Sequence, residues 1–317
     1  MDTLEKGRQS MSQRKIGAHV SAAGGLHLAV VKAAAIGCNC AQLFSGSPRV
    51  WSKKPLDQFN TIKLFSEMQK SNVSPIFTHA LYLVNFASDK PELLRKSFDS
   101  IKYELEFDSL IRGAGVIVHV GSHQGRGWAA VKDQVCDQIA AVLRVTPDNS
   151  KFLIENSAGQ KGKVGSPLEE IRYILDELEK MGKYVSTERV GWCFDTCHAF
   201  ASGYHLAETK DSKQTIEQGS LLAVPAASAL ATIKQLDLWS TLTCIHVNDS
   251  RDPFASGRDR HANLDDGTIP TSEFKAFLND KRLEKIPLVL EVPGIEKQGP
   301  DAENIKRLKQ LVGESQS

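Results

Sequence analysis

Short apolar runs alternate with longer amphipathic segments along the chain. The runs are rich in β-branched residues and predict strands at 15–21, 39–45, 74–80, 115–122, 151–157, 190–196, 243–250 and 287–293. Between them, apolar residues recur at helical spacing in segments that include 26–37, 91–113, 128–145, 166–182 and 226–239. Ser166, Pro167 and Glu169 also follow a helix-start pattern. The chain is therefore expected to repeat a strand followed by a helix.

Eight consecutive strand–helix units favour one closed barrel. Strands buried on both faces of a parallel sheet are continuous apolar runs, and eight such units in about 300 residues are typical of a (β/α)₈ TIM barrel. The alternative, an open doubly wound sheet, would need a glycine-rich phosphate turn after its first strand, and Gly24-Gly25 is not GxGxxG. We expect one barrel domain over 15–317, with the active site at the C-terminal mouth of the strands. A disordered tail is expected over 1–14, and either Met1 or Met11 could start the chain.

The composition fits a globular enzyme rather than a membrane-embedded or disordered chain. Of the 317 residues, 41% are hydrophobic and 24% are charged, and no apolar window is long enough to cross a bilayer. The six cysteines are sparse and lie mostly in apolar runs, so we expect free thiols and a reducing compartment. That compartment would be the cytoplasm, or the nucleus in a eukaryotic host. A formal net charge of +1 does not by itself indicate a nucleic-acid partner.

Six of the eight predicted strands have, at or near their ends, a residue type that binds metals: His79, His119, Glu155, Asp195, His246 and Glu291. In a β/α barrel the C-terminal strand ends open onto one mouth, so these side chains should converge despite their separation in sequence. A single histidine of this kind is more often a hydrogen-bonded core residue. Recurrence at the same end of six units instead predicts a metal centre.

Three further candidate ligands lie in loops just past the strands: His198, Asp259 and His261. Asp259 and His261 have i, i+2 spacing, which places both side chains on one side of an extended segment. The resulting five imidazoles and four carboxylates suit borderline divalent ions such as Zn²⁺, Mn²⁺ or Fe²⁺. Nine ligands exceed the needs of one ion. We therefore expect three ions with three or four protein ligands each, one carboxylate bridging two of them.

The segment GWCFDTCHAFASGYHL (191–206) also contains two thiols. Cys193 and Cys197 are separated by three residues, unlike the CxxC pairs of zinc knuckles, and no second pair lies nearby. Their direction along a strand does not exclude them, because Cys193, Asp195 and Cys197 would point the same way. All other strand-end candidates are His, Asp or Glu, so both cysteines are interpreted as structural. Of the remaining histidines, His19 and His123 are expected at the mouth, around the ligands rather than among them.

Nine short stretches, spread in this order along the chain, can be compared with known families: GAHVSAAGG (17–25), SPRVW (47–51), HALYLVN (79–85), HVGSH (119–123), ENSAGQ (155–160), DTCHAFASGY (195–204), HVNDS (246–250), RDRH (258–261) and LEVP (290–293). In these the chain resembles the endonuclease IV family of abasic-site endonucleases, from Ile16 to the helix after the eighth strand. The resemblance implies a zinc-dependent β/α barrel that cleaves the phosphodiester 5′ to an abasic site in duplex DNA. The products would be a 3′-OH and a 5′-deoxyribose phosphate, and the enzyme would also act on blocked 3′ ends.

The resemblance also implies how the nine ligands divide among the ions. One zinc would be held by His79 and His119, a second by Asp195, His246 and Glu291, and a third by His198, Asp259 and His261, with Glu155 bridging the first two. One of the three Zn²⁺ could be replaced by Mn²⁺ or Fe²⁺. A hydroxide between the ions bridged by Glu155 would be the nucleophile, which gives Glu155 and Glu291 catalytic roles beside their ligand roles.

DNA contacts are implied by residues in the early loops. Arg49 matches an arginine inserted into the duplex, and Tyr82 matches a tyrosine beside the flipped-out abasic nucleotide. Three Zn²⁺ and one hydroxide would bring the loaded protein to about +6, so cationic loops could hold phosphates: Arg49, Lys53, Lys54, Lys161, Lys163, Arg251, Arg258 and Arg260. The expected partner is double-stranded DNA with abasic sites or blocked 3′ ends. We expect the protein to be a monomer and not to bind membranes. Val120 stands where the family commonly has proline and Asp265 where it has glycine, which bears on local loop conformation.

Two other functions compete with this interpretation. A metal-dependent sugar isomerase or epimerase uses a similar barrel with two divalent ions, but it would need neither nine ligands nor the loops of Arg49 and Tyr82. A protein that binds abasic DNA without cutting it would not need an open polynuclear site. An assay with an abasic duplex and with ketoses distinguishes an endonuclease from a sugar isomerase. Substitution of Glu155 distinguishes an enzyme that cuts DNA from a protein that only binds it.

Overall fold

The computed structural model describes residues 14–160, 162–182, 185, 188–208 and 228–314. Of the predicted tail over 1–14, only Arg14 is among them, and its guanidinium donates to the carbonyls of Leu278 and Leu283 at 2.8 and 3.0 Å. Lys161, residues 209–216 of an expected loop and residues 226–227 of a predicted helix lie outside the described residues.

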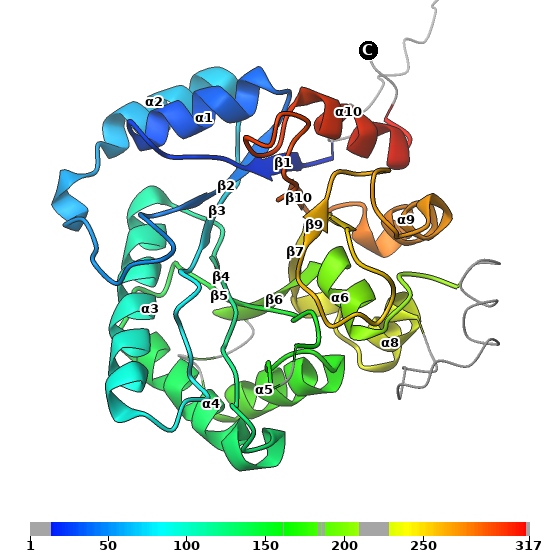
Figure 1. The fold of residues 1–317 in the computed structure, drawn as a ribbon. Coiled ribbons are helices and arrows are strands. Elements are labelled where there is room, and N and C mark those ends of the chain that lie inside the picture. Colours follow the sequence, from blue (N-terminus) through cyan, green and yellow to red (C-terminus); the bar gives the residue numbers. More distant parts are fainter. Residues whose placement is uncertain (1–13, 161, 183–184, 186–187, 209–227, 315–317) are drawn as a thin grey trace, which may run out of the picture.

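The eight predicted strands form a closed parallel barrel (Figure 1). They are β1 (Ile16–His19), β2 (Cys40–Phe44), β3 (Ile76–His79), β4 (Val116–Val118), β5 (Phe152–Glu155), β6 (Val190–Asp195), β7 (Leu242–His246) and β10 (Leu288–Leu290). Their hydrogen-bonded order is β1-β10-β7-β6-β5-β4-β3-β2, and β1 pairs with β2 to close the ring. The predicted TIM barrel is therefore confirmed, and the doubly wound alternative is excluded by closure.

Helices surround the barrel on its outer side (Figure 1). They are α1 (Leu26–Ala35), α2 (Thr61–Ser71), α3 (Pro91–Ile111), α4 (Trp128–Arg144), α5 (Leu168–Lys180), α6 (Thr196–Ser202), α8 (Ala229–Gln235), α9 (Thr271–Leu278) and α10 (Ala302–Leu311). Short 3₁₀ turns occur at η1 (Leu56–Gln58), η3 (Trp239–Thr241) and η4 (Lys281–Leu283). The predicted cap of α5 is wrong: no side chain caps this helix, and Glu170 rather than Glu169 reaches back to accept from Gly165 N at 2.8 Å.

A small antiparallel pair lies in the expected functional loop after β7. Strand β8 (Asp249–Ser250) pairs with β9 (His261–Ala262), with Ser250 opposite His261. Asp249 stabilises the return of the chain, because its carboxylate accepts from the main-chain N–H groups of Gly267 and Ile269 at 3.1 and 3.0 Å. This hairpin sets the position of His261, and of the loop residues that precede it, at the barrel mouth.

The barrel interior is layered, because residues i and i+2 of a strand point the same way. An apolar floor is formed by Cys40, Phe77, Ile117, Leu153, Cys193, Cys244 and Val289. Two residues further along the same strands is a polar ring that consists of Gln42, His79, His119, Glu155, Asp195, His246 and Glu291. The floor separates this polar ring from the opposite end of the barrel.

The main hydrophobic core lies between the strands and the helices. It includes large side chains that are fully buried, such as Phe86, Phe107, Phe152, Trp192 and Phe277. All six cysteines are buried and free, as predicted. Among the described residues, none of the helices has both the length and the apolar character needed to cross a bilayer.

One buried carboxyl predicts a measurable pH dependence of stability. Asp108 on α3 accepts from Thr78 Oγ1 and Ser150 Oγ at 3.2 and 2.8 Å, and burial raises its pKa to about 7. An unfolded aspartate has a pKa of about 3.9, so between these values only the folded chain holds the proton. The free energy of unfolding should therefore fall as pH rises from about 4 to about 7, by on the order of 4 kcal/mol from this group.

Asp108→Asn removes that titration. Urea midpoints of the two proteins, measured in chelator, should diverge between about pH 5 and pH 8, the variant changing less with pH than the parent. Parallel pH profiles would show that Asp108 does not titrate in this range in the folded protein.

Candidate metal centre

The strand ends bring the six predicted ligands of the barrel strands to one place. Four of them are the last residues of their strands: His79, Glu155, Asp195 and His246. The other two, His119 and Glu291, directly follow the last residues of β4 and β10. Because all these strands are parallel and adjacent in the ring, their side chains converge on the axis at the C-terminal mouth.

Glu155 is fully buried at the middle of this arrangement. Its Oε2 lies 3.2 Å from His79 Nε2 and 3.1 Å from His119 Nε2, and its Oε1 lies 3.0 Å from His246 Nδ1. Burial alone would raise the pKa of Glu155, but His119 and His246 outweigh it and hold the pKa well below its usual range. The two oxygens of one carboxylate thus face different groups of imidazoles, as a bridging ligand must.

A second group adjoins the first through Glu155. His246 Nδ1 lies 3.3 Å from Glu291 Oε2 and 3.8 Å from Asp195 Oδ2. Ligand atoms of Glu155, Asp195, His246 and Glu291 all lie within 4.8 Å of one another. Burial lowers the pKa of His246, but Glu291 and Glu155 raise it to about 10. Cation binding here would compete with protons, so acid should weaken it.

The third group comes from elements outside the barrel strands. His198 lies on α6, and its Nε2 is 3.0 Å from Asp259 Oδ1; His261 on β9 places its Nε2 3.4 Å from the same oxygen. Asp195 also belongs here, since its ligand atoms lie within 4.8 Å of those of both imidazoles. The three loop residues predicted from sequence are therefore brought together, with Asp195 on their inner side.

Two buried ring nitrogens of the cluster are available to bind a metal ion. His198 Nε2 and His261 Nε2 are buried, and although they lie 3.0 and 3.4 Å from Asp259 Oδ1, neither has the geometry of a hydrogen bond to a described residue. Buried polar atoms without a hydrogen bond are rare and costly. Both nitrogens lie near the Asp259 carboxylate, so the two imidazoles and this carboxylate could bind the same ion. This donor set of neutral imidazoles and carboxylates fits divalent ions of the zinc type.

The second nitrogen of several imidazoles is fixed by a hydrogen bond. His79 Nδ1 lies 2.7 Å from Ala80 O, and His198 Nδ1 lies 3.0 Å from Asn156 O. A carbonyl can only accept, so Nδ1 carries a proton in each ring and Nε2 faces the cluster. Asn248 likewise fixes Asp195, because its amide donates to Asp195 Oδ2 at 2.7 Å. Such partners orient metal ligands in proteins.

The thiols lie beside the cluster but in a different layer. Cys193, Cys244 and His246 also place ligand atoms within 4.8 Å of one another. However, both cysteines belong to the apolar floor, and burial raises the pKa of Cys193 well above its usual range. A thiolate is thus disfavoured there, whereas burial is outweighed by the neighbouring imidazoles at Glu155 and Glu291, whose pKa values are held well below their usual range. The geometry agrees with a structural role for Cys193.

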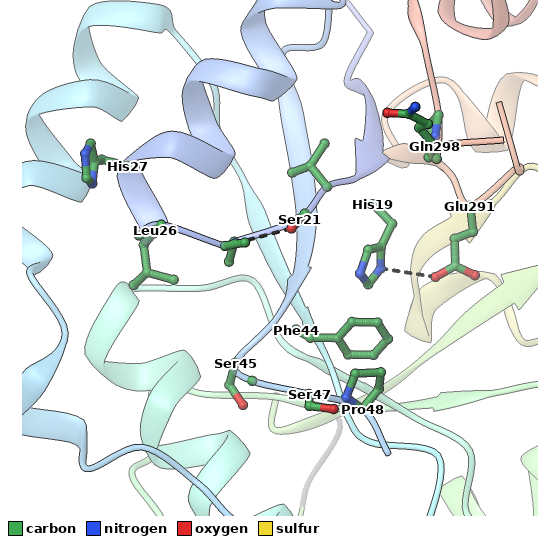
Figure 2. Close-up of a pocket in the computed structure, with 18 of the residues that line it drawn as sticks. His19, Ser21, Leu26, His27, Phe44, Ser45, Ser47, Pro48, Glu291 and Gln298 are labelled. Carbon is green, nitrogen blue, oxygen red and sulfur yellow. Dashed lines mark hydrogen bonds and ion pairs between the residues drawn. The ribbon is translucent and has the colours of Figure 1, made fainter. Parts of the chain in front are cut away.

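Cavities open above the polar ring. One of about 270 Å³ is lined by His79, Tyr82, His119, His198, Asp259, His261, Glu291 and Pro293. A larger one of about 1200 Å³ continues between the loops after β1 and β2 and the segment after β10 (Figure 2). Tyr82, 53% exposed, stands over the cluster with its ring 5.8 Å from that of His79. Arg49 is exposed on the loop after β2.

Some cations predicted to contact phosphate have other partners. Lys53 forms an ion pair with the buried Glu104 and exposes only 12% of its side chain, so the prediction for Lys53 is wrong. Arg260 and Arg258 both pair with Asp252, and their side chains are 47% and 65% exposed. The carboxylate of Asp252 therefore offsets part of the positive charge expected at this loop.

The chain matches one known family over most of its length. Residues 30–311 match a family described as xylose isomerase-like TIM barrels. A protein named probable endonuclease 4 from Halothermothrix orenii is 33% identical over 295 residues, which are 93% of this chain and 99% of that protein. The chain belongs to the endonuclease IV family.

Solved structures agree with membership of the endonuclease IV family. Endonuclease IV from Thermus thermophilus matches with a TM-score of 0.77 at 29% identity, covering 95% of this chain and 100% of that one. The 3-keto-D-glucoside 4-epimerase from E. coli matches with a TM-score of 0.62 at 13% identity, covering 94% and 99%. At that identity the epimerase shares the fold alone.

The two departures from the endonuclease IV pattern are accommodated. Asp265 has φ 67°, the left-handed region that favours glycine, and its Oδ1 accepts from Thr271 Oγ1 at 2.9 Å. A non-glycine residue in this region costs about 1 kcal/mol, less for aspartate because of its short polar side chain. Val120 is fully buried, and its carbonyl accepts from Phe86 N at 2.9 Å. Both loops therefore keep a defined path past the cluster.

Proposed function

We propose that this chain is a zinc-dependent DNA-repair hydrolase that cleaves the phosphodiester 5′ to abasic sites in duplex DNA. The products would be a 3′-OH and a 5′-deoxyribose phosphate. The observation that carries the proposal is the convergence of five imidazoles and four carboxylates in three adjoining groups beneath a cavity. The endonuclease IV relatives supply the substrate class. The proposed enzyme acts as a monomer, through the single domain over 15–317.

Each group of ligands has a proposed role. We assign one ion to His79 and His119, one to Asp195, His246 and Glu291, one to His198, Asp259 and His261, and a bridge to Glu155. Bound divalent ions supply Lewis acidity, which neutralises phosphate oxygens and lowers the pKa of water toward about 7. Glu155 would hold the first two groups together and orient the attacking water, and Glu291, which lines the cavity of about 270 Å³, would act beside it.

Charge explains why such a site needs cations. Four carboxylates crowd the mouth, and the formal charge of the whole chain is only +1. Three bound ions would add six positive charges to this mouth, so the loaded site would attract a phosphodiester anion more strongly than the carboxylates and imidazoles alone. DNA binding and metal binding are therefore coupled in the proposal. The proposed enzyme would also remove blocking groups from 3′ ends, because their removal breaks the same type of phosphate ester.

The shape of the mouth suits a nucleotide without its base. A cavity of about 270 Å³ is small compared with those that hold drug-sized ligands. An abasic nucleotide has lost stacking and pairing, so it leaves the helix at lower cost than an intact one. Tyr82 would occupy space beside the flipped sugar, and Arg49, on the neighbouring loop, would enter the duplex.

A nicking assay tests the proposal. The purified, untagged protein is incubated with a duplex that contains one abasic site, with an intact duplex, and with ketoses. We expect incision 5′ to the abasic site only. Isomerisation or epimerisation of a ketose without nicking would overturn the proposal in favour of a sugar-modifying enzyme.

Loss of the Tyr82 ring should weaken recognition of the abasic site. Tyr82→Ala is expected to lower kcat/KM on the abasic duplex by about 10- to 100-fold, because the ring would pack against the flipped sugar and burying a large side chain contributes about 1.5–3 kcal/mol. Val145→Ala is a matched control, since Val145 is also 53% exposed but directly follows α4, in the connection that leads to the start of β5 rather than at the C-terminal mouth. Steady-state incision kinetics provide the measurement. Equal values for the two variants would remove Tyr82 from the recognition surface.

Arg49→Ala should act differently from the tyrosine variant. We expect KM to rise by about 10-fold with a smaller change in kcat, and the dependence of binding on salt to become weaker, because one cationic contact to DNA is lost. Binding titrations at several salt concentrations provide the measurement. An unchanged salt slope would show that Arg49 does not contact the DNA.

A further inference from the structure

The polar ring contains one residue that is not a metal-ligand type. Gln42 on β2 is fully buried and occupies the ring position of its strand, two residues beyond Cys40 of the apolar floor. In the parallel ladder it lies opposite His19 of β1. The two strands β1 and β2 thus contribute an imidazole and an amide at the side of the ring where no predicted ligand originates.

All hydrogen-bonding groups of this amide are used. Gln42 Oε1 lies 2.7 Å from His246 Nε2, so the ring donates to it. Gln42 Nε2 donates to Glu291 Oε1 at 2.5 Å and contacts His19 Nδ1 at 2.8 Å. His19 Nδ1 itself lies 3.5 Å from Glu291 Oε1, and Figure 2 shows the two side chains facing each other. One amide therefore joins two members of the second ligand group.

This arrangement differs from that of the neighbouring imidazoles. His79 is held by the main-chain carbonyl of Ala80, and His198 by that of Asn156. A substitution of Ala80 or Asn156 would not remove these carbonyls. His246 is instead held by a side chain. When Nε2–H is donated to Gln42, the Nδ1 lone pair is directed at the space shared with Glu155 and Glu291.

We propose that Gln42 is a positioning residue for the second ion of the centre, acting through His246 and Glu291. It fixes the tautomer of His246 with its oxygen and the rotamer of Glu291 with its nitrogen. This inference rests on the proposed metal-dependent function. A neutral amide performs both tasks, since it accepts from the imidazole and donates to the carboxylate without adding charge to the ring.

Substitution at Gln42 separates positioning from stability. Gln42→Met keeps the length of the side chain but removes all three contacts, and Gln42→Asn keeps an amide that is one methylene too short to reach both partners. Gln134→Met is the matched control: the amide of Gln134 donates to the carbonyls of Phe86 and Ser88 at 2.7 and 2.9 Å, away from the ring.

Metal affinity is the decisive readout. Zinc is titrated into chelator-treated protein in competition with a colorimetric chelator, and Co²⁺ absorption spectra are recorded for the same variants. We expect both Gln42 variants to lose about 10- to 100-fold in affinity for one ion, with an altered Co²⁺ spectrum and the other ions unaffected. kcat on the abasic duplex should fall with little change in KM. Gln134→Met should match the parent in zinc affinity and Co²⁺ spectrum, whatever its melting temperature.

The outcomes distinguish this inference from the proposed function. A parent that binds zinc and incises abasic DNA, together with Gln42 variants of unchanged zinc affinity and Co²⁺ spectrum, would overturn the role of Gln42 alone. A parent that binds no divalent ion would overturn both. If Gln42→Met does not fold, Gln42→Asn decides by the same readouts.

Discussion

Replacing Glu155 with glutamine is expected to reduce incision of an abasic duplex by at least about 10³-fold while leaving duplex binding nearly unchanged. The reason is the position of both oxygens: Oε2 faces His79 and His119, and Oε1 faces His246. An amide offers one uncharged oxygen and turns two N–H donors toward ring nitrogens, so it cannot bridge two sites. Single-turnover incision and equilibrium binding of the same duplex, both with zinc present, measure the two effects.

Another buried glutamate of the chain provides the control. Glu273 is also fully buried and lies 2.8 Å from an imidazole nitrogen, that of His205, but it stands on α9 outside the polar ring. Glu273→Gln should lower the melting temperature and keep incision. If Glu155→Gln cut at the parental rate, the bridging role would be wrong. If the variant bound DNA as tightly as the parent but did not cut it, while the parent did, the parent would not be a protein that only binds abasic DNA.

The barrel could be predicted from sequence because its strands are buried on both faces. Such strands are continuous apolar runs, and a polar residue near the end of a run stands out, as His79 and Glu155 do. Parallel strands then determine that these ends share one mouth. His198, Asp259 and His261 were found by proximity to strand ends and by spacing, although the hairpin of β8 and β9 that positions His261 has no distinct signal in the sequence.

Other features needed the three-dimensional contacts. Gln42 lies in the run NCAQLFS, where a single glutamine carries no signal of its own; its ring position follows only when the inward-facing residues of all strands are compared. Lys53 was expected to contact phosphate, but it is held by Glu104 from α3, more than fifty residues away in sequence. The helix cap at Ser166 was wrong because local patterns do not show which of Glu169 and Glu170 faces the main chain.

Removing the divalent ions should cost the protein both activity and stability. The ligand groups are preformed, with four carboxylates and five imidazoles held at short range, and ions that bind only the folded chain stabilise it by mass action. At a free concentration about 1000 times the dissociation constant, each ion contributes about 4 kcal/mol. Saturating chelator is therefore expected to abolish incision and to lower the melting temperature by about 5–10 °C for each ion lost.

Restoring the ions tests whether the loss is specific. Zinc added back to the chelated protein should recover incision and melting temperature together, with a stoichiometry that reports the number of sites. Mg²⁺ should recover neither, because it prefers an oxygen-only octahedral shell and the imidazoles of His79, His198 and His246 disfavour it. The same titration at about pH 5 should need more zinc than at neutral pH, because the pKa of His246 is raised to about 10 and the higher proton concentration competes more strongly with the ion for this ring. Incision that survives exhaustive chelation, with an unchanged melting temperature, would contradict the metal centre, since the ligands would then have to work as protein acids and bases alone.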